Sequence, residues 1–269
     1  MKDKRVLYVS SEVIPYLPET EISSMSFEAP RMINNAGGQI RIFMPRYGNI
    51  NERRHQLHEV IRLSGMNLVI NDMDMPLIIK VASIPKERIQ VYFIDNDDYF
   101  KRKATYADEE GNMYKDNDER AIFFAKGVIE TVKKLNWAPD IIHVHGWLAS
   151  FLPLYLRNYY GSEPLFENSK IVTSVYNTGF EGPLGDNTLK KIEYDAIEDD
   201  AIAVLKDPTY TNMMKVAIQN SDAVIIGSPD IDPELQEYLD TLTKPVLKYH
   251  KLEEFSQGYT DFYCDEVLK

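Results

Sequence analysis

Polar and aromatic side chains follow three of the strands that the sequence predicts. They are Glu12, His145, Trp147, Tyr176 and Asn177. The carboxyl ends of parallel strands meet at one edge of a sheet, and ligands of open α/β folds bind at that edge. Carboxylate and amide groups can hydrogen-bond the hydroxyl groups of a sugar, and aromatic rings can stack on its face. These residue types in this pattern therefore predict a ligand-binding site at this edge.

Each of these assignments has a structural alternative. Glu12 could cap the turn that follows its strand, and Trp147 could begin a helix and pack in the core. His145 could be a hydrogen-bonded structural histidine, as could His143 two residues earlier. Alternating histidines resemble metal ligands, but Cys264 is the single cysteine and no further histidine or carboxylate lies nearby in ligand spacing. We therefore expect no metal and no other cofactor.

The start of the chain predicts the unit that positions Glu12. Residues 5–9 form a short apolar run with β-branched side chains, which is typical of a buried parallel strand. Prolines at positions 15 and 18 favour an extended loop, because proline fixes φ and disfavours helix in the residue before it. Apolar residues then recur at helical spacing over 22–33, and a second strand is expected at 40–44. This order of elements opens many nucleotide-binding α/β folds.

The rest of the chain predicts a single α/β domain over residues 1–269. Apolar or alternating runs predict further strands at 60–63, 66–70, 77–82, 89–94, 141–145, 171–175 and 222–226. Helical spacing predicts helices at 118–135, 147–160, 213–219, 233–242 and 249–255. We expect inserted β-hairpins at about 60–95 and a helical tail at about 232–269. Strands that alternate with helices through short loops indicate a doubly wound, mostly parallel, Rossmann-like sheet.

Composition and charge limit the classes of partner. The chain has 269 residues, of which 44% are hydrophobic, as in ordinary globular proteins. Its 42 acidic and 30 basic residues give a net charge of −12, which disfavours nucleic acid and anionic membranes as partners. A single cysteine fits a reducing compartment, and no apolar run approaches the roughly 20 residues of a membrane span. The first strand begins almost at the N-terminus without a signal sequence, so we expect a cytoplasmic protein.

Several blocks of the sequence, in one order, resemble a known family. They are RVLYVSSEVIPY, IRIFMPRYGNI, DNDERAIFFAKGVIE, PDIIHVHGWLASFLPLYLR, TSVYNTGFEG and SDAVIIGSP. These blocks are similar to the N-terminal domain of bacterial glycogen synthases and plant starch synthases. The family consists of retaining hexosyltransferases with the GT-B architecture, in which two α/β domains face each other across a cleft. The first domain mainly holds the growing α-1,4-glucan and the second mainly holds the nucleotide-sugar. The resemblance implies a stand-alone glucan-side half, in which the strand-end residues named above are the expected contacts for glucan or sugar.

The chain departs from the family at the loop that should bind the donor. The family's K-x-G-G-L falls on Pro18, Glu19, Thr20, Glu21 and Ile22, which carry neither the lysine nor the glycines. A loop that holds a diphosphate needs close backbone approach, free N–H groups at a helix start and usually a cation. Both glutamates would repel a nucleotide-sugar, whereas they suit the first turn of a helix because they complement its dipole. We therefore expect a capped helix terminus and a degenerate donor loop.

Two further family motifs are altered beside the expected sugar site. The family's H-D-W-H begins at His145, and Gly146 stands in place of its aspartate. In the family's T-x-H-N, Tyr176 replaces a histidine that helps to hold the transferred glucose, while Asn177 matches the family. Tyrosine can stack on a sugar, but it cannot act as a neutral base near pH 7. No Ser-His-Asp or paired-carboxylate arrangement suggests a separate hydrolytic activity, and we assign no catalytic residue.

These observations leave three interpretations of the function. The chain could take part in glycogen synthesis, inactive alone, with a partner subunit that supplies the second domain. It could instead be a non-catalytic relative that binds α-glucan or a small sugar, or that regulates a full synthase. It could also be an interaction module whose former cleft face contacts a second copy or another subunit, because large exposed apolar patches are usually covered. The three differ in whether the isolated protein elongates glycogen or only binds it.

Overall fold

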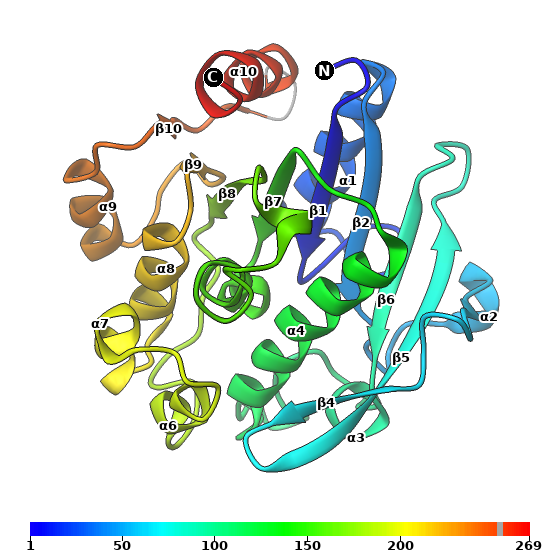
Figure 1. Ribbon diagram of the computed structural model, residues 1–269, viewed down its shortest axis with the longest axis vertical. Coiled ribbons are helices and arrows are strands. Elements are labelled where there is room, and N and C mark those ends of the chain that lie inside the picture. The colour runs from blue at the N-terminus through cyan, green and yellow to red at the C-terminus, as the bar shows by residue number, and fades with distance from the viewer. Residues whose placement is uncertain (252–254) are drawn as a thin grey trace.

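A computed structural model describes residues 1–251 and 255–269, and its centre is a large, mostly parallel sheet (Figure 1). The parallel strands are β1 (Arg5–Ser10), β2 (Gln39–Pro45), β6 (Gln90–Asp95), β7 (Ile141–His145), β8 (Lys170–Val175), β9 (Ala223–Ile226) and β10 (Val246–Leu247). The antiparallel strands are β3 (His58–Glu59), β4 (Met66–Ile70) and β5 (Met73–Ser83). Across the described residues the order is β10-β9-β8-β7-β1-β2-β6-β5-β3, with β4 paired to β5. This confirms the doubly wound α/β class that the sequence predicts.

Helices cover both faces of the sheet (Figure 1). One face carries α1 (Glu21–Asn35) and α10 (Phe255–Phe262), which pack against each other, and the other carries α4 (Asn117–Leu135), α5 (Phe151–Leu154) and α8 (Tyr210–Gln219). The remaining helices are α2 (Glu52–His55), α3 (Asp97–Phe100), α6 (Thr188–Glu193), α7 (Asp199–Ile202) and α9 (Pro233–Asp240). Short helical turns are η1 (Trp147–Ala149), η2 (Tyr155–Tyr159), η3 (Pro164–Phe166), η4 (Ala203–Lys206) and η5 (Tyr263–Val267). Among the described helices, none is both long enough and apolar enough to cross a membrane.

The direction of winding reverses between β1 and β7. From β1 the chain continues through β2 and β6 on one side, whereas β7, β8 and β9 follow on the other. Ser10 and His145, the last residues of β1 and β7, are register partners, so the loops after these two strands begin side by side. Ligands of open α/β sheets bind at such a reversal, outside the carboxyl ends of the strands. The fold thus singles out the loops that begin at Ser11 and Gly146.

Some elements differ from the sequence-based expectations. The strand expected at 60–63 is a turn, in which the amide groups of Leu63 and Ser64 donate hydrogen bonds to the carbonyl oxygen of Val60. Strand β10 was not predicted, because two residues are too few for a hydrophobic pattern to be recognised. The helix expected at 249–255 falls partly outside the described residues, and α10 begins at Phe255.

A buried group of polar side chains connects the central strands to the end of the chain. The ring nitrogens of His143 lie 2.5 Å from the hydroxyl of Tyr263 and 2.7 Å from Oγ of Ser174. The hydroxyl of Tyr263 also lies 3.3 Å from that of Tyr8. Burial, and to a smaller extent the neighbouring His145, lower the pKa of His143 well below its usual range. A neutral, hydrogen-bonded histidine therefore joins η5 to β1, β7 and β8.

We expect Tyr263→Phe to lower the free energy of unfolding by about 1–3 kcal/mol, because it leaves a buried nitrogen of His143 without its partner. Urea denaturation followed by circular dichroism measures this change. Tyr159→Phe is a matched control, since the Tyr159 side chain is 44% exposed, and its effect should stay within about 0.5 kcal/mol. Equal effects of the two substitutions would show that the hydrogen bonds of Tyr263 do not hold the end of the chain.

Candidate functional site

The end of β7 contacts the end of β8 through a histidine–tyrosine pair. Nδ1 of His145 lies 2.7 Å from the hydroxyl of Tyr176, and both side chains are buried. Burial lowers the pKa of His145 to about 3, so the ring is neutral at pH 7. Its Nε2 makes no hydrogen bond to any described residue. Because the Tyr176 ring is only 2% exposed, stacking on a sugar would require this loop to move.

Gly227, just after β9, makes the inward position of Tyr176 possible. A Cβ atom at Gly227 would lie 2.4 Å from the Tyr176 ring, a distance that no real side chain tolerates. The hydroxyl of Tyr210, from α8, donates a hydrogen bond to the backbone oxygen of Tyr176. The tyrosine that replaces the family's histidine is therefore held from three sides, by β7, by α8 and by the chain after β9.

Glu12 and Trp147 both contact Tyr106, which lies in the loop between α3 and α4. The carboxylate of Glu12 accepts hydrogen bonds from the Tyr106 hydroxyl at 3.0 Å and from the Thr20 hydroxyl at 2.7 Å. The Tyr106 ring lies 4.9 Å from that of Trp147, and Phe180 lies 5.1 Å from Trp147 on another side. Sequence analysis missed Tyr106, because the polar loop around it has no periodicity and matches no motif.

The family's aspartate position, now Gly146, has no room for a larger residue. Gly146 has a φ of +81°, in the left-handed region that favours glycine. A Cβ atom there would lie 1.9 Å from Oγ of Ser11 and 3.4 Å from Cδ1 of Ile22. An aspartate at this position would therefore require both the backbone and Ser11 to move.

Residues 18–22 lead into α1, whose first turn is capped by the chain itself. Oγ1 of Thr20 accepts a hydrogen bond from the amide of Ser23 at 3.0 Å, and Oγ of Ser23 accepts one from the amide of Thr20 at 2.8 Å. This reciprocal arrangement is a capping box. It occupies an amide group that a bound phosphate would otherwise use.

Hydrogen bonds connect the start of α1 to β8 and β9. Oγ of Ser228 donates to the carboxylate of Glu21 at 2.5 Å and accepts from the amide of Asn177 at 2.9 Å. The side chain of Asn177 is exposed. Beside this chain of bonds lies a hollow of about 310 Å³, lined by Glu19, Thr20, Glu21, Ser24, Met25, Gly227, Tyr249 and His250. No lysine or arginine belongs to that described lining, so the local charge disfavours a diphosphate.

The two histidines of β7 are not arranged as metal ligands. Both ring nitrogens of His143 are engaged by Tyr263 and Ser174, and Nδ1 of His145 is engaged by Tyr176. Over residues 1–251 and 255–269, no group of three or more histidine, cysteine or acidic side chains could hold a metal ion.

Comparison with known proteins places the chain in a family. A family model described as the starch synthase catalytic domain matches residues 5–245. The glycogen synthase of Chlorobium luteolum is 35% identical over 228 residues, which cover 84% of this chain and 46% of that protein. The glycogen synthase of Chlorobium limicola is 36% identical over 225 residues, with 83% and 45% covered. The chain thus spans about half the length of the curated relatives it matches.

A solved structure supports the same assignment at the level of the fold. It is the catalytic domain of starch synthase IV from Arabidopsis thaliana bound to ADP and acarbose. The superposition has a TM-score of 0.67 at 16% sequence identity and covers 83% of this chain and 45% of that chain. Strands β1 to β9 and the loops after them fall within residues 5–245, which the family model matches, whereas α10 and η5 lie after that range. The chain therefore belongs to the glycogen and starch synthase family, as a glycosyltransferase domain of the GT-B fold.

Proposed function

We propose that this chain supplies the glucan-holding half of an α-1,4-glucan synthase and does not transfer glucose by itself. The observation that carries the proposal is a contrast along one edge of the sheet. Glu12 and Asn177 offer polar groups suited to sugar hydroxyls beside the end of β7, whereas Glu19 and Glu21 place negative charge at the start of α1. The matched relatives are named glycogen synthases, and the chain spans about half their length.

A nucleotide-sugar lacks the contacts it would need on this half. A diphosphate is held by free amide groups and cations. Here Thr20 already caps the amide of Ser23, and the carboxylate of Glu21 is fixed by Ser228. A carboxylate at this helix start repels the negative charge of a phosphate. The loop at residues 18–22 is therefore proposed to be degenerate for the donor.

A glucan chain would use the accessible polar groups at the ends of β1 and β8. The Asn177 side chain is exposed, and Glu12 is half-buried with Tyr106 over it. We infer that His145, Trp147 and Tyr176 shape the floor beneath such a ligand, because all three are buried. The starch synthase IV structure holds both ADP and acarbose, and we assign the carbohydrate and not the nucleotide to this half.

The nucleotide-binding half would come from a partner subunit at the same edge of the sheet. Transfer requires cations near the leaving phosphate. No lysine or arginine is among the described residues that line the hollow beside α1. A subunit that carried such groups would face the ends of β1, β7 and β8 across a cleft. A second copy of this chain over that edge is the other arrangement to be tested.

We expect ADP-glucose and UDP-glucose to bind this chain weakly or not at all, because carboxylates replace the cation and glycines at residues 18–22. Isothermal titration calorimetry with each nucleotide-sugar measures the affinity. A dissociation constant near or below about 10 μM, which corresponds to roughly 7 kcal/mol of binding, contradicts this expectation and the proposed loss of the donor loop.

We expect Asn177→Ala to weaken maltooligosaccharide binding at least threefold, because it removes an accessible amide at the proposed glucan surface. Asn168→Ala is the matched control, since Asn168 is also an exposed loop asparagine but precedes β8 instead of following it. Affinity gel electrophoresis in glycogen and titration with maltoheptaose measure both variants. Unchanged binding by the Asn177 variant would place the glucan elsewhere.

Tyr176→Phe tests the role of the buried floor. It keeps the ring beside Gly227 but removes the hydroxyl from Nδ1 of His145, and we expect it to lower the free energy of unfolding by about 1–3 kcal/mol. Thermal denaturation measures the stability, and maltoheptaose titration below the transition measures binding. An unaltered stability together with a large loss of affinity would instead make the Tyr176 hydroxyl a direct ligand of the sugar.

The isolated chain is expected to transfer no glucose to glycogen above background. One preorganised electrostatic contact typically contributes about 10²–10³ to a rate, and this chain differs from the family at the donor loop, at Gly146 and at Tyr176. The assay is incorporation of labelled glucose from both nucleotide-sugars, with and without candidate partner proteins. Transfer only with a partner supports the proposal, whereas robust transfer by the isolated chain refutes it. Glycogen binding without transfer under any condition would favour the regulatory alternative.

A further inference from the structure

A cation-rich hollow lies away from the candidate glucan site. It has a volume of about 700 Å³ and is lined by residues of α2 and of the turn that joins β5 to β6. These two elements lie on the right of Figure 1. Its lining includes Ile40 and Gln90, near the amino ends of β2 and β6. The candidate glucan site is at the carboxyl ends of the strands, and none of its residues lines this hollow. Its size is within the usual range of small-molecule sites, about 300–1,000 Å³.

The basic side chains around this hollow have no acidic partners. Arg54, Lys86 and Arg88 line it, and among the described residues none of the three forms an ion pair. Glu52, on the same helix as Arg54, is instead engaged by Lys80 and Arg46. In a chain with 42 acidic and 30 basic residues, three unpaired cations around one hollow are a local reversal of the net charge. Unpaired cations that share a concave surface raise the local concentration of anions.

Two of these basic residues have a positive backbone φ angle, which is uncommon for residues other than glycine. Lys86 has a φ of 71° and Arg88 a φ of 58°, and both belong to the turn between β5 and β6. Gln56, on the facing helix end, has a φ of 55°. Residues other than glycine are uncommon in this region, and such conformations concentrate at functional sites. The three strained residues all line the same hollow.

Uncharged polar groups lie among the cations. Tyr16 lines the hollow with a side chain that is 5% exposed, and its hydroxyl is buried without a partner in the described structure. The Tyr16 ring is fixed by edge contacts with Phe93 at 4.9 Å and with His55 at 5.0 Å. Ser83 and Gln90 add a hydroxyl and an amide. Hydroxyl and amide groups beside cations suit a ligand that has both a phosphate and hydroxyl groups.

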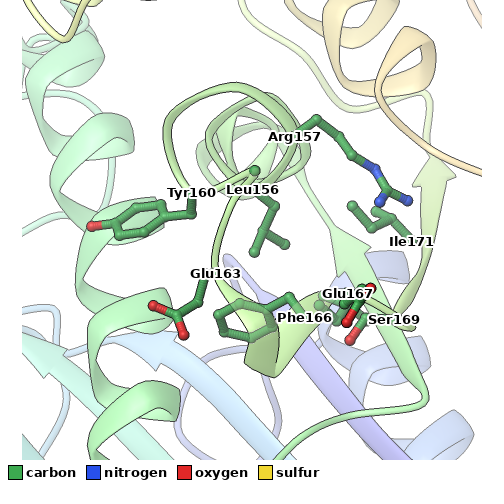
Figure 2. Close-up of a pocket in the computed structure, with 10 residues that line it drawn as sticks. Leu156, Arg157, Tyr160, Glu163, Phe166, Glu167, Ser169 and Ile171 are labelled. Carbon is green, nitrogen blue, oxygen red and sulfur yellow. The ribbon is translucent and has the colours of Figure 1, made fainter.

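A second cavity lacks this combination. Figure 2 shows a smaller cavity of about 140 Å³, in which Arg157 extends toward Ile171 while Glu163 lies near Phe166. Its single arginine is already paired, since Arg157 lies 2.6 Å from Asp222, and Glu163 lies 3.2 Å from Lys133. A new ligand there would have to break an ion pair, whereas the hollow beside α2 offers cations that are free to bind.

We propose that the hollow between α2 and the β5–β6 turn binds a small molecule that carries a phosphate group. Arg54, Lys86 and Arg88 would hold the phosphate oxygens, and the exposed side chains of Ser83 and Gln90 would hold hydroxyl groups of an attached sugar. Guanidinium groups favour phosphate in particular, because their planar donors match two of its oxygens at once. This site is independent of the proposed glucan-holding function, since it shares none of the residues assigned to that function.

Calorimetric titration with glucose 1-phosphate, inorganic phosphate and uncharged glucose tests the proposal on the full chain. The variants are Arg54→Gln, Arg88→Gln and the two combined. Arg53→Gln is the matched control, because Arg53 is an exposed arginine on the same helix but does not line the hollow. We expect the combined variant to weaken binding of glucose 1-phosphate at least tenfold and the control less than twofold. Thermal denaturation should show all variants folded, since the altered side chains are exposed.

The probes separate the two sources of phosphate. Binding of inorganic phosphate as tightly as glucose 1-phosphate identifies a plain phosphate site, and tighter binding of glucose 1-phosphate identifies a sugar phosphate site; either supports the proposal. Affinity that falls as salt is raised from about 50 to 500 mM is also expected for an exposed ionic contact. The proposal is overturned if neither phosphate probe binds at about 10 mM, a limit of roughly 3 kcal/mol, or if the combined variant binds as well as the unaltered chain.

Discussion

Two neutral histidines in the middle of the sheet impose the requirement on which much of the structure depends. The rings of His143 and His145 lie 3.9 Å apart on β7 and are fully buried. A buried polar group without a partner costs about 1–3 kcal/mol, so each ring needs a hydroxyl group beside it. For His143 that group comes from Tyr263 near the end of the chain, and for His145 it comes from Tyr176 after β8. Because Tyr176 points inward to reach His145, its ring leaves no room for a Cβ atom at Gly227.

This arrangement determines what remains available at the carboxyl edge. With Tyr176 directed into the core, the accessible polar groups are the side chain of Asn177 and the carboxylate of Glu12 under Tyr106. The start of α1 adds negative charge at Glu21, where Ser228 holds it in place. Positive charge is concentrated instead near the amino ends of β2 and β6. The accessible polar groups at the ends of β1 and β8 and the unpaired cations of the hollow thus come from different residues of the fold.

Several properties followed from the sequence by itself. The apolar run at residues 5–9 and the helical spacing that follows predicted β1 and α1, because strands covered on both faces are apolar throughout. The ordered blocks that resemble glycogen and starch synthases predicted the family and the fold, which the comparisons confirm. Glutamates at positions 19 and 21 suggested a capped helix start, and Thr20 forms a capping box there. Each of these depends on neighbouring residues or on a motif.

Only the tertiary structure decided how distant segments meet. Tyr106 covers Glu12 across 94 positions of the chain, and Tyr263 reaches His143 across 120. The cation-rich hollow needs Arg54 from α2, Arg88 from the β5–β6 turn and Tyr16 from the first loop. No periodicity marks such residues, because loops carry no repeating burial pattern and their partners are set by how strands are ordered in the sheet. The short-range pattern of the sequence therefore specified the elements and the family, whereas long-range packing specified which side chains meet at the candidate sites.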